Sequence, residues 1–366
     1  MDLSKLKHFC FFIGYPRSAH SVVAQCLNSR KDAVVSLEAN IFKLLMKKPD
    51  IAFEEICESI LLRDRMFVQN RNFNWTSYDY LIDSKFQGYF NELLLIGDKD
   101  GGNTTHRLKK DFSLLNKIKC LSPVPIKIIH AVRNPLDNIS TQYVQTNNRF
   151  VNQIKKYLKS VRANNDISKK LPKSEIFTLY NDELLASPRK ILTDLASFVG
   201  LPRDDSWLEK CEQKLYRRES RTRVDAPWEL KTVDWLLERI SGIEFMEHYR
   251  DDIIKFRAQV KDGRFQMSPG AEDWRRAMDF AADGDCSSTL RLAKTAIDKG
   301  FGRGNNLGFV IVLSEMLEEL DEAKRLEAEF RKRFPTLVFN RERYEEHLRK
   351  SMPKAAEKRG PRHSNI

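Results

Sequence analysis

The chain has 366 residues, of which 41% are hydrophobic and 31% are charged. A chain of this length can bury one large core and still carry a further segment, and this composition excludes a disordered or fibrous protein. Its 63 lysines and arginines exceed its 51 aspartates and glutamates, which gives a formal net charge of +12. That excess favours anionic partners: nucleotides, sulfated or phosphorylated substrates, nucleic acids or acidic membrane surfaces.

The sequence shows no membrane span, export signal or metal site. No apolar run reaches the ~20 residues that a spanning helix needs, and the first apolar segment starts too close to Met1 to follow a signal peptide. The six cysteines are scattered, without a CxxC pair or a cysteine–histidine cluster. We therefore predict a cytoplasmic protein with reduced cysteines and no bound metal.

The first predicted unit is a strand, a loop and a helix. Residues 9–13 are apolar and predict a buried strand, the next helix runs to about Asn28, and residues 33–37 predict a second strand. The connecting segment, Gly14–Ser21, is called the phosphate loop below. Free backbone amides and the positive end of a helix dipole favour a bound phosphate or sulfate in such a turn.

The phosphate loop has the spacing of a Walker loop, Gly-x4-Gly-Lys-Ser/Thr, with two letters changed. Ala19 stands in place of the second glycine and His20 in place of the lysine, while Arg17 enters the turn. The loop therefore predicts an anion site. It does not predict one built for the magnesium-bound phosphates of a nucleoside triphosphate.

Three further apolar runs predict strands of the same sheet, at residues 93–97, 126–132 and 176–180. Strands that alternate with helices predict a parallel sheet with right-handed crossovers. The predicted fold class is therefore α/β, with three layers (α/β/α) around a central parallel sheet and a P-loop-like opening unit.

The chain changes character near residues 261–270, and beyond this point it predicts helices without strands. These helices cover residues 274–281, 289–299, 307–317 and 322–334. Their small residues make the helix pairs similar to tetratricopeptide-type hairpins, and plain packing against the first domain is an equal alternative.

The sequence therefore predicts three parts of the chain. We predict an α/β domain over residues 1–260, a small helical, tetratricopeptide-like region over 268–340, and a basic, disordered tail over 350–366. The helical region is a candidate surface for a protein partner or for self-association.

Four segments lie at or just after the carboxyl ends of predicted strands, where α/β sheets bind ligands. They are Gly14–Ser21, Leu37-Glu38, Asp98-Lys99 and Arg133-Asn134-Pro135. In this order the chain resembles the sulfotransferase family, which uses 3′-phosphoadenosine 5′-phosphosulfate (PAPS) as donor. The similarity covers roughly residues 9–250.

The individual motifs support that resemblance. Residues 15–18 are similar to the family's 5′-phosphosulfate loop, and residues 133–141 to its 3′-phosphate motif. Residues 180–188 with 198–202 are similar to a structural signature of the family. The resemblance implies a sulfotransferase fold, PAPS as donor with 3′-phosphoadenosine 5′-phosphate (PAP) as product, and no metal.

Donor-binding residues are carried over from the resemblance. For the 5′-phosphosulfate they are Arg17, Ser18, Ala19, His20 and Ser21. For the 3′-phosphate they are Arg133 and Thr141, with Ser140 as the neighbouring alternative, and either Arg221 or Arg223 from a later loop. Ala19 and His20 depart from the Gly-Thr/Ser of the family, so His20 either donates to the donor's anion or points away and packs.

The catalytic residues also follow from the resemblance. Glu38, after the second strand, resembles the base of the tyrosylprotein and heparan 3-O-type branches, and an acceptor hydroxyl needs such a base because its own pKa is far above neutrality. Asp98 is the rival base. Lys99 and Arg17 are expected to stabilise the transferring sulfuryl group, whose charge spreads over its oxygens as in phosphoryl transfer.

Two other functions stay open. A P-loop nucleotide kinase or NTPase is favoured by the Walker spacing and by the strand-like run 94–98, and a requirement for magnesium would support it. A non-catalytic sulfotransferase-like interaction protein is the other alternative.

The sulfuryl acceptor is a small molecule, a carbohydrate or a peptide, and no nucleic acid is expected. Its pocket is expected from residues 41–90 and 142–172. The first of these segments holds the aromatic residues Phe73, Trp75, Tyr78 and Tyr80.

Overall fold

The computed structural model describes residues 3–69, 81–83, 86–87, 89–146, 149–215, 221–335, 337 and 339–352. Within them, five strands form one sheet in the order β2-β3-β1-β4-β5, and all neighbouring strands are parallel. The strands are β1 His8–Gly14, β2 Ala33–Leu37, β3 Leu95–Lys99, β4 Ile126–Val132 and β5 Ile176–Tyr180. The predicted aromatic residues at positions 73, 75, 78 and 80 and the tail from 353 lie outside the described residues.

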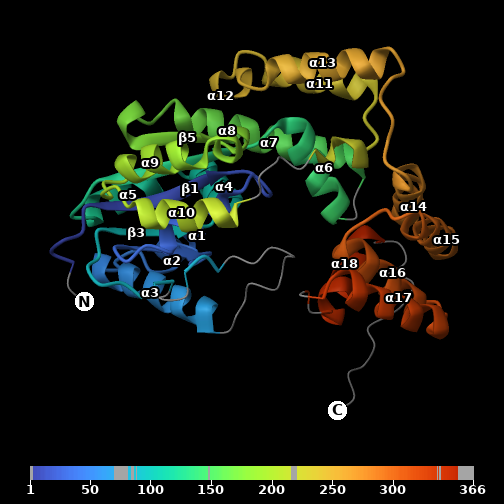
Figure 1. The fold of residues 1–366 in the computed structure, drawn as a ribbon, viewed down its shortest axis with the longest axis horizontal. Coiled ribbons are helices and arrows are strands. Elements are labelled where there is room, and N and C mark those ends of the chain that lie inside the picture. Colours follow the sequence, from blue (N-terminus) through green and yellow to red (C-terminus); the bar gives the residue numbers. More distant parts are fainter. Residues whose placement is uncertain are drawn as a thin grey trace.

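Helices connect and follow these strands (Figure 1). Up to residue 261 they are α1 His20–Asn28, α2 Ile41–Lys47, α3 Phe53–Gln69, α4 Gly102–Lys110, α5 Ser113–Leu121, α6 Pro135–Thr146, α7 Phe150–Ser168, α8 Asn181–Ala186, α9 Pro188–Phe198, α10 Asp205–Lys214, α11 Leu230–Ile240, α12 Glu244–Glu247 and α13 Arg250–Lys261. The described residues of this part also form the short 3₁₀ helices η2 Lys173–Glu175 and η3 Thr222–Asp225. None of the helices in the described ranges is both long and apolar enough to span a membrane.

The sheet is buried on both faces. Along β1, Phe9, Phe11 and Ile13 pack on the side of α2, α4 and α5, while Cys10 and Phe12 pack on the side of α1, α9 and α10. Successive side chains of a strand point to opposite faces, so an apolar residue at every position requires helices on both sides. This arrangement confirms the predicted three-layer α/β fold with a central parallel sheet.

The position of β3 places the end of this strand beside the end of β2. β3 lies between β1 and β2, and it begins and ends two residues later than the predicted run 93–97. Asp98 and Lys99 continue the strand because they pair with Ser36 and Leu37 of β2. Lys99 is therefore the last residue of β3, directly opposite the end of β2.

The chain after residue 261 is helical, as predicted. The helices are α14 Ala271–Asp283, α15 Cys286–Asp298, α16 Gly304–Met316, α17 Leu320–Arg333 and α18 Arg341–Ser351. The sequence pattern does not predict α18, whose residues are mostly charged and polar and give a weak apolar pattern. Figure 1 shows these helices, coloured orange to red, as a lobe on the far side of α6 from the sheet.

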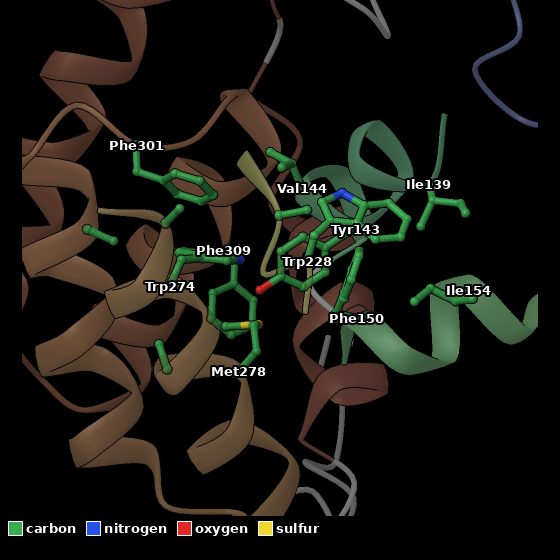
Figure 2. Packing of buried hydrophobic residues seen from close by; sticks show 14 of the residues in the cluster. Ile139, Tyr143, Val144, Phe150, Ile154, Trp228, Trp274, Met278, Phe301 and Phe309 are labelled. Atoms are coloured by element: carbon green, nitrogen blue, oxygen red, sulfur yellow. The ribbon is translucent and has the colours of Figure 1, made fainter. Parts of the chain in front are cut away.

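This lobe packs against α6 rather than standing free. Trp274 of α14 and Phe309 of α16 share one apolar cluster with Tyr143 of α6 and Trp228, as Figure 2 shows. The side-chain amide of Asn306 donates to the carbonyl oxygen of Val144 at 2.7 Å. Because the last carbonyls of a helix lack partners within the helix, Asn306 caps the end of α6 from the lobe.

Candidate active site

A cavity of about 470 Å³ opens at the carboxyl edge of the sheet. The described residues that line it are Pro16, Arg17, Ala19, His20, Ser21, Val22, Glu38, Lys99, Asp100, Gly102, Asn103, His106, Arg133, Thr141, Lys156, Asn181, Leu184, Leu185 and Leu215. The cavity thus collects predicted site residues from four separate segments of the chain. Each segment follows a strand, which explains why residues far apart in sequence meet here.

The phosphate loop folds with an unusual backbone. Arg17 and Ala19 have φ angles of 68° and 70°, in the left-handed region that residues with a side chain rarely adopt. Such a conformation costs about 1–2 kcal/mol per residue. At Gly14 a side chain is excluded, because a Cβ there would lie 2.6 Å from the carbonyl oxygen of Ala131. Strain of this kind gathers at functional sites, where the surrounding structure holds it.

Neighbouring elements hold the loop in place. The backbone amide of Gly14 donates to Thr105 Oγ1 of α4 at 3.1 Å. Asn138 of α6 donates to the carbonyl oxygen of Pro16 at 3.2 Å, and Arg133 donates to that of Arg17, also at 3.2 Å. These bonds tie the loop to the two helices that flank the cavity.

The side chains of Ser18 and His20 form hydrogen bonds within the phosphate loop. Ser18 is fully buried and donates to the carbonyl oxygen of Tyr15 at 2.8 Å, and it is not among the lining residues. His20 does line the cavity, with Nδ1 at 3.1 Å from Ser18 Oγ. Burial, followed by the nearby Lys99 and Arg17 cations, lowers the pKa of His20 well below its ordinary value, so the imidazole is neutral at pH 7.

Glu38 and Lys99 form an ion pair beside the phosphate loop. Lys99 Nζ lies 3.0 Å from Glu38 Oε1, and the Glu38 amide donates to the Lys99 carbonyl oxygen at 3.0 Å. The Lys99 side chain is 1% exposed, whereas that of Glu38 is 38% exposed. Glu38 also has a positive φ, 63°, which turns the chain out of β2. The predicted base and the predicted cation therefore meet, with the carboxylate open to the cavity.

Asp98, the rival base, lies beneath this turn and is not among the lining residues. Its carboxylate accepts from the amides of Ala39 and Ile41 at 2.9 and 3.1 Å and from the Ser36 hydroxyl at 3.2 Å. Burial raises the pKa of Asp98 to about 6. These contacts fix the start of α2 and the turn that carries Glu38, so the structure places Asp98 in a supporting position.

A chain of hydrogen bonds runs from Arg133, which also contacts the phosphate loop, along another wall of the cavity. Arg133 Nη1 donates to Thr141 Oγ1 at 3.1 Å, and Thr141 Oγ1 lies 2.7 Å from Thr222 Oγ1. The Thr222 hydroxyl donates to the carbonyl oxygen of Asp137 at 2.8 Å. Ser140 faces away: it donates to Leu136 O, and Trp228 Nε1 donates to it at 3.0 Å. Thr141 therefore lines the cavity and Ser140 does not.

The two later arginines lie outside the described lining of the cavity. Arg223 forms ion pairs with Asp137 at 2.6 Å and Asp252 at 2.7 Å, and its guanidinium lies over the Phe256 ring. Arg221 is exposed at the start of η3. Arg223 thus holds η3 against α6 in this structure, while Thr222 between the two arginines supports Thr141.

Several lining residues were not predicted from the sequence. Asp100 and Asn103 follow the end of β3, the place where strand-end chemistry is expected, so their position carried a usable signal. His106 and Lys156 come from α4 and α7, which pack against each other, and only tertiary structure brings them to the rim. Apolar side chains form the remaining wall, namely Val22, Leu184, Leu185 and Leu215.

The charges that line this cavity favour an anion. Arg17, Lys99, Arg133 and Lys156 bring positive charge, against Glu38 and Asp100. The N-terminus of α1 adds the positive end of its dipole at the phosphate loop. Among the described residues, no group of three or more His, Cys, Asp or Glu side chains is arranged to hold a metal ion.

Comparison with known proteins agrees with this geometry. The model of a family described as the sulfotransferase family matches residues 10–205, more than half of the chain. This chain belongs to the sulfotransferase family. A search of curated proteins found no match.

Solved structures similar to this sulfotransferase include three from different organisms. The sulfotransferase domain of the Synechococcus PCC 7002 olefin synthase has 17% identity and a TM-score of 0.35, covering 56% of this chain and 78% of that one. Mouse sulfotransferase SULT7A1 complexed with PAP has 16% identity and a TM-score of 0.33, covering 58% and 66%. A sulfotransferase from Alicyclobacillus acidocaldarius has 12% identity and a TM-score of 0.36, covering 66% and 95%.

Proposed function

We propose that this sulfotransferase transfers the sulfuryl group of PAPS to a hydroxyl or amine of its acceptor by in-line displacement, with Glu38 as general base. The observation that carries the proposal is the cavity itself. It brings Arg17 and the Glu38–Lys99 pair into one cavity with Arg133 and Thr141. A nucleotide with phosphates at both its 5′ and 3′ positions needs more than one cation, and this cavity supplies several.

The proposed binding of PAPS rests on the cations and the hydrogen-bond donors of the cavity. When bound, PAPS supplies an activated sulfuryl group. Arg17, the amides at the start of α1 and the Ser21 hydroxyl are suited to its 5′-phosphosulfate, and Arg133 with Thr141 to its 3′-phosphate. A guanidinium matches the planar edge of a phosphate better than a lysine does, which fits arginines in both positions.

The chemical roles follow from the ion pair. Glu38 is open to the cavity and accepts the proton that the acceptor loses. Lys99 is buried and held by Glu38, so its charge is pre-positioned for the developing negative charge of the transfer. Asp98 has its carboxylate engaged below the cavity, which favours Glu38 as the base.

The kinase alternative lacks its central residue. A Walker loop uses a lysine on the β- and γ-phosphates, and His20 occupies that place here as a neutral side chain. The function is therefore proposed to need no magnesium. We further propose that the protein acts in the cytoplasm, which its six free cysteines support.

A screen with labelled PAPS tests the proposal. Small alcohols and phenols, amines, oligosaccharides and tyrosine peptides are incubated with the protein, and products are read by the mass added on sulfation. We expect transfer without magnesium and a fall of about 100-fold or more in Lys99→Ala. Lys110→Ala, an exposed lysine of α4, is the matched control. Magnesium-dependent use of ATP with no transfer from PAPS would contradict the proposal.

A further inference from the structure

His20 sits at a fixed position between two walls of the cavity. It is the first residue of α1, and its ring packs against the turn between β3 and α4. A Cβ added at Gly101 would lie 2.9 Å from both His20 Nε2 and Cε1. The imidazole therefore has backbone on one side and the cavity on the other.

The hydrogen bonds of Ser18 determine which ring nitrogen carries the proton. A serine hydroxyl has one proton, and Ser18 donates it to the carbonyl oxygen of Tyr15. Ser18 Oγ therefore accepts a hydrogen bond from His20 Nδ1–H at 3.1 Å. A neutral imidazole has only one N–H, so Nε2 carries a lone pair. No hydrogen-bond donor of the described residues contacts Nε2.

The Nε2 lone pair is unfavourable next to an anion bound in the cavity. An anion held by Arg17, Lys99 and the start of α1 would meet an acceptor atom at His20, and two acceptors repel. Protonation of Nε2 removes this conflict, because an imidazolium donates from both nitrogens.

Charge that enters with a ligand changes the balance that sets the protonation state of His20. Burial is the main cause that lowers the pKa of His20, and the cations of Lys99 in β3 and Arg17 in the phosphate loop add to it. Glu38 is paired with Lys99, and Asp100 lies at the turn next to Gly101. A bound polyanion offsets the two cations, and the imidazolium then becomes favourable.

We propose that His20 takes up one proton from solvent when the donor nucleotide binds, and that the resulting imidazolium donates from Nε2 to the nucleotide's 5′-anion. This inference rests on the proposed PAPS site. It makes His20 a binding residue whose charge exists only in the occupied site. Because binding and protonation are linked, the affinity for nucleotide rises as the pH falls, by up to tenfold per pH unit.

Calorimetry with PAP tests this coupling without any acceptor. PAP is titrated into the protein at pH 7 in two buffers of different ionisation enthalpy, which gives the number of protons taken up per PAP bound. We compare the wild type with His20→Asn, which keeps a donor for Ser18 but cannot be protonated. His248→Gln, at a histidine that is not among the described lining residues of the cavity, is the matched control.

We expect the wild type and His248→Gln to take up as much as one proton more per PAP than His20→Asn does. Protonation of PAP itself is common to all three proteins and cancels in the difference. Equal proton uptake in the wild type and His20→Asn would overturn the inference and leave the proposed function standing. Failure of the wild type to bind PAP at all would instead overturn the proposed function.

A second readout covers the case in which His20→Asn does not fold. The ¹⁵N chemical shifts of the His20 ring in the wild type distinguish a neutral imidazole with Nδ1–H from an imidazolium. We expect the first form without PAP and the second with it at pH 7. An imidazole that stays neutral with PAP bound would contradict the proposal.

Discussion

Two parts of the cavity, which meet where Arg133 donates to the Arg17 carbonyl oxygen, are built in different ways and are called the transfer end and the anchor end. The transfer end, formed by Arg17, His20, Glu38 and Lys99, has left-handed backbone at Arg17 and Glu38 and a half-open carboxylate. At the anchor end, formed by Arg133, Thr141, Thr222 and Asp137, each named group is tied to the next by a hydrogen bond. The difference indicates that one end keeps polar atoms available for chemistry while the other end is fixed in advance for binding.

Removal of the base gives the largest expected effect, and it acts on turnover alone. In Glu38→Gln we expect kcat with PAPS and an acceptor from the screen to fall by about 10²–10⁴-fold, the usual range for a general base. The Kd of PAP stays within about threefold, because a neutral amide still accepts the Lys99 hydrogen bond.

Asp98→Asn is the matched control for this variant, since its carboxylate lies below the cavity. Its kcat at pH 7 is expected to fall less than that of Glu38→Gln, because the amide disturbs the turn that carries Glu38 but leaves Glu38 itself in place. Wild-type turnover in Glu38→Gln together with a large loss in Asp98→Asn would reverse the assignment of the base.

Arg133→Ala tests the anchor end and acts on binding. A hydrogen bond to a charged group is worth about 1.5–3 kcal/mol, so we expect the Kd of PAP to rise by roughly 10- to 150-fold. Titration calorimetry measures this change. Arg221→Ala, an exposed arginine outside the described lining, is the control and should change the Kd by less than about threefold. A large loss in Arg221→Ala with none in Arg133→Ala would mean that the later loop, not Arg133, holds the 3′-phosphate.

The buried carboxyl of Asp98 predicts a pH effect on folding stability. Its pKa is raised from 3.8 to about 6 in the folded protein, so the folded state binds the proton more tightly than the unfolded chain does. Stability from this group is therefore present below pH 4 and is lost as the pH rises through about 6.

This loss is about 2–3 kcal/mol, and Asp98→Asn lacks it. Urea unfolding of both proteins between pH 4 and 7 measures the difference in their free energies of unfolding. We expect the wild type to lose stability relative to Asp98→Asn across this window. A constant difference would show that the Asp98 pKa is not raised.

Thr222→Val gives the smallest expected effect. It removes the hydroxyl between Thr141 and Asp137, which should lower the free energy of unfolding by about 1 kcal/mol and weaken PAP binding by roughly threefold. Thr193→Val on the exposed side of α9 is the control. If PAP affinity is unchanged while stability falls, Thr222 supports the fold and not the anchor end.

Sequence patterns predicted the sheet well where strands are mostly apolar. Residues 126–132 and 176–180 are mostly apolar and match the bounds of β4 and β5. β3 was placed two residues early because Asp98 and Lys99 are polar, and only their pairing with β2 keeps them in the strand. Local pattern cannot show such pairing.

In the candidate site, too, local pattern predicted residues at strand ends but could not show contacts between distant segments. Residues at strand ends, such as Glu38, Lys99 and Arg133, were brought together as predicted. The choice between Ser140 and Thr141 depended on Trp228, which comes from a distant segment and holds Ser140 away from the cavity. Lys156 lies in the middle of α7 with no local signal, and it reaches the rim through helix packing alone.

One binding measurement tests the central claim most directly. Calorimetric titration of the wild type with PAP, with 5′-AMP and with magnesium-ATP compares three nucleotides that share the adenosine and the 5′-phosphate. If the anchor end is a 3′-phosphate site, PAP binds at least about 100-fold more tightly than 5′-AMP, and magnesium adds nothing. Equal affinity for PAP and 5′-AMP, or tighter binding of magnesium-ATP, would contradict the account.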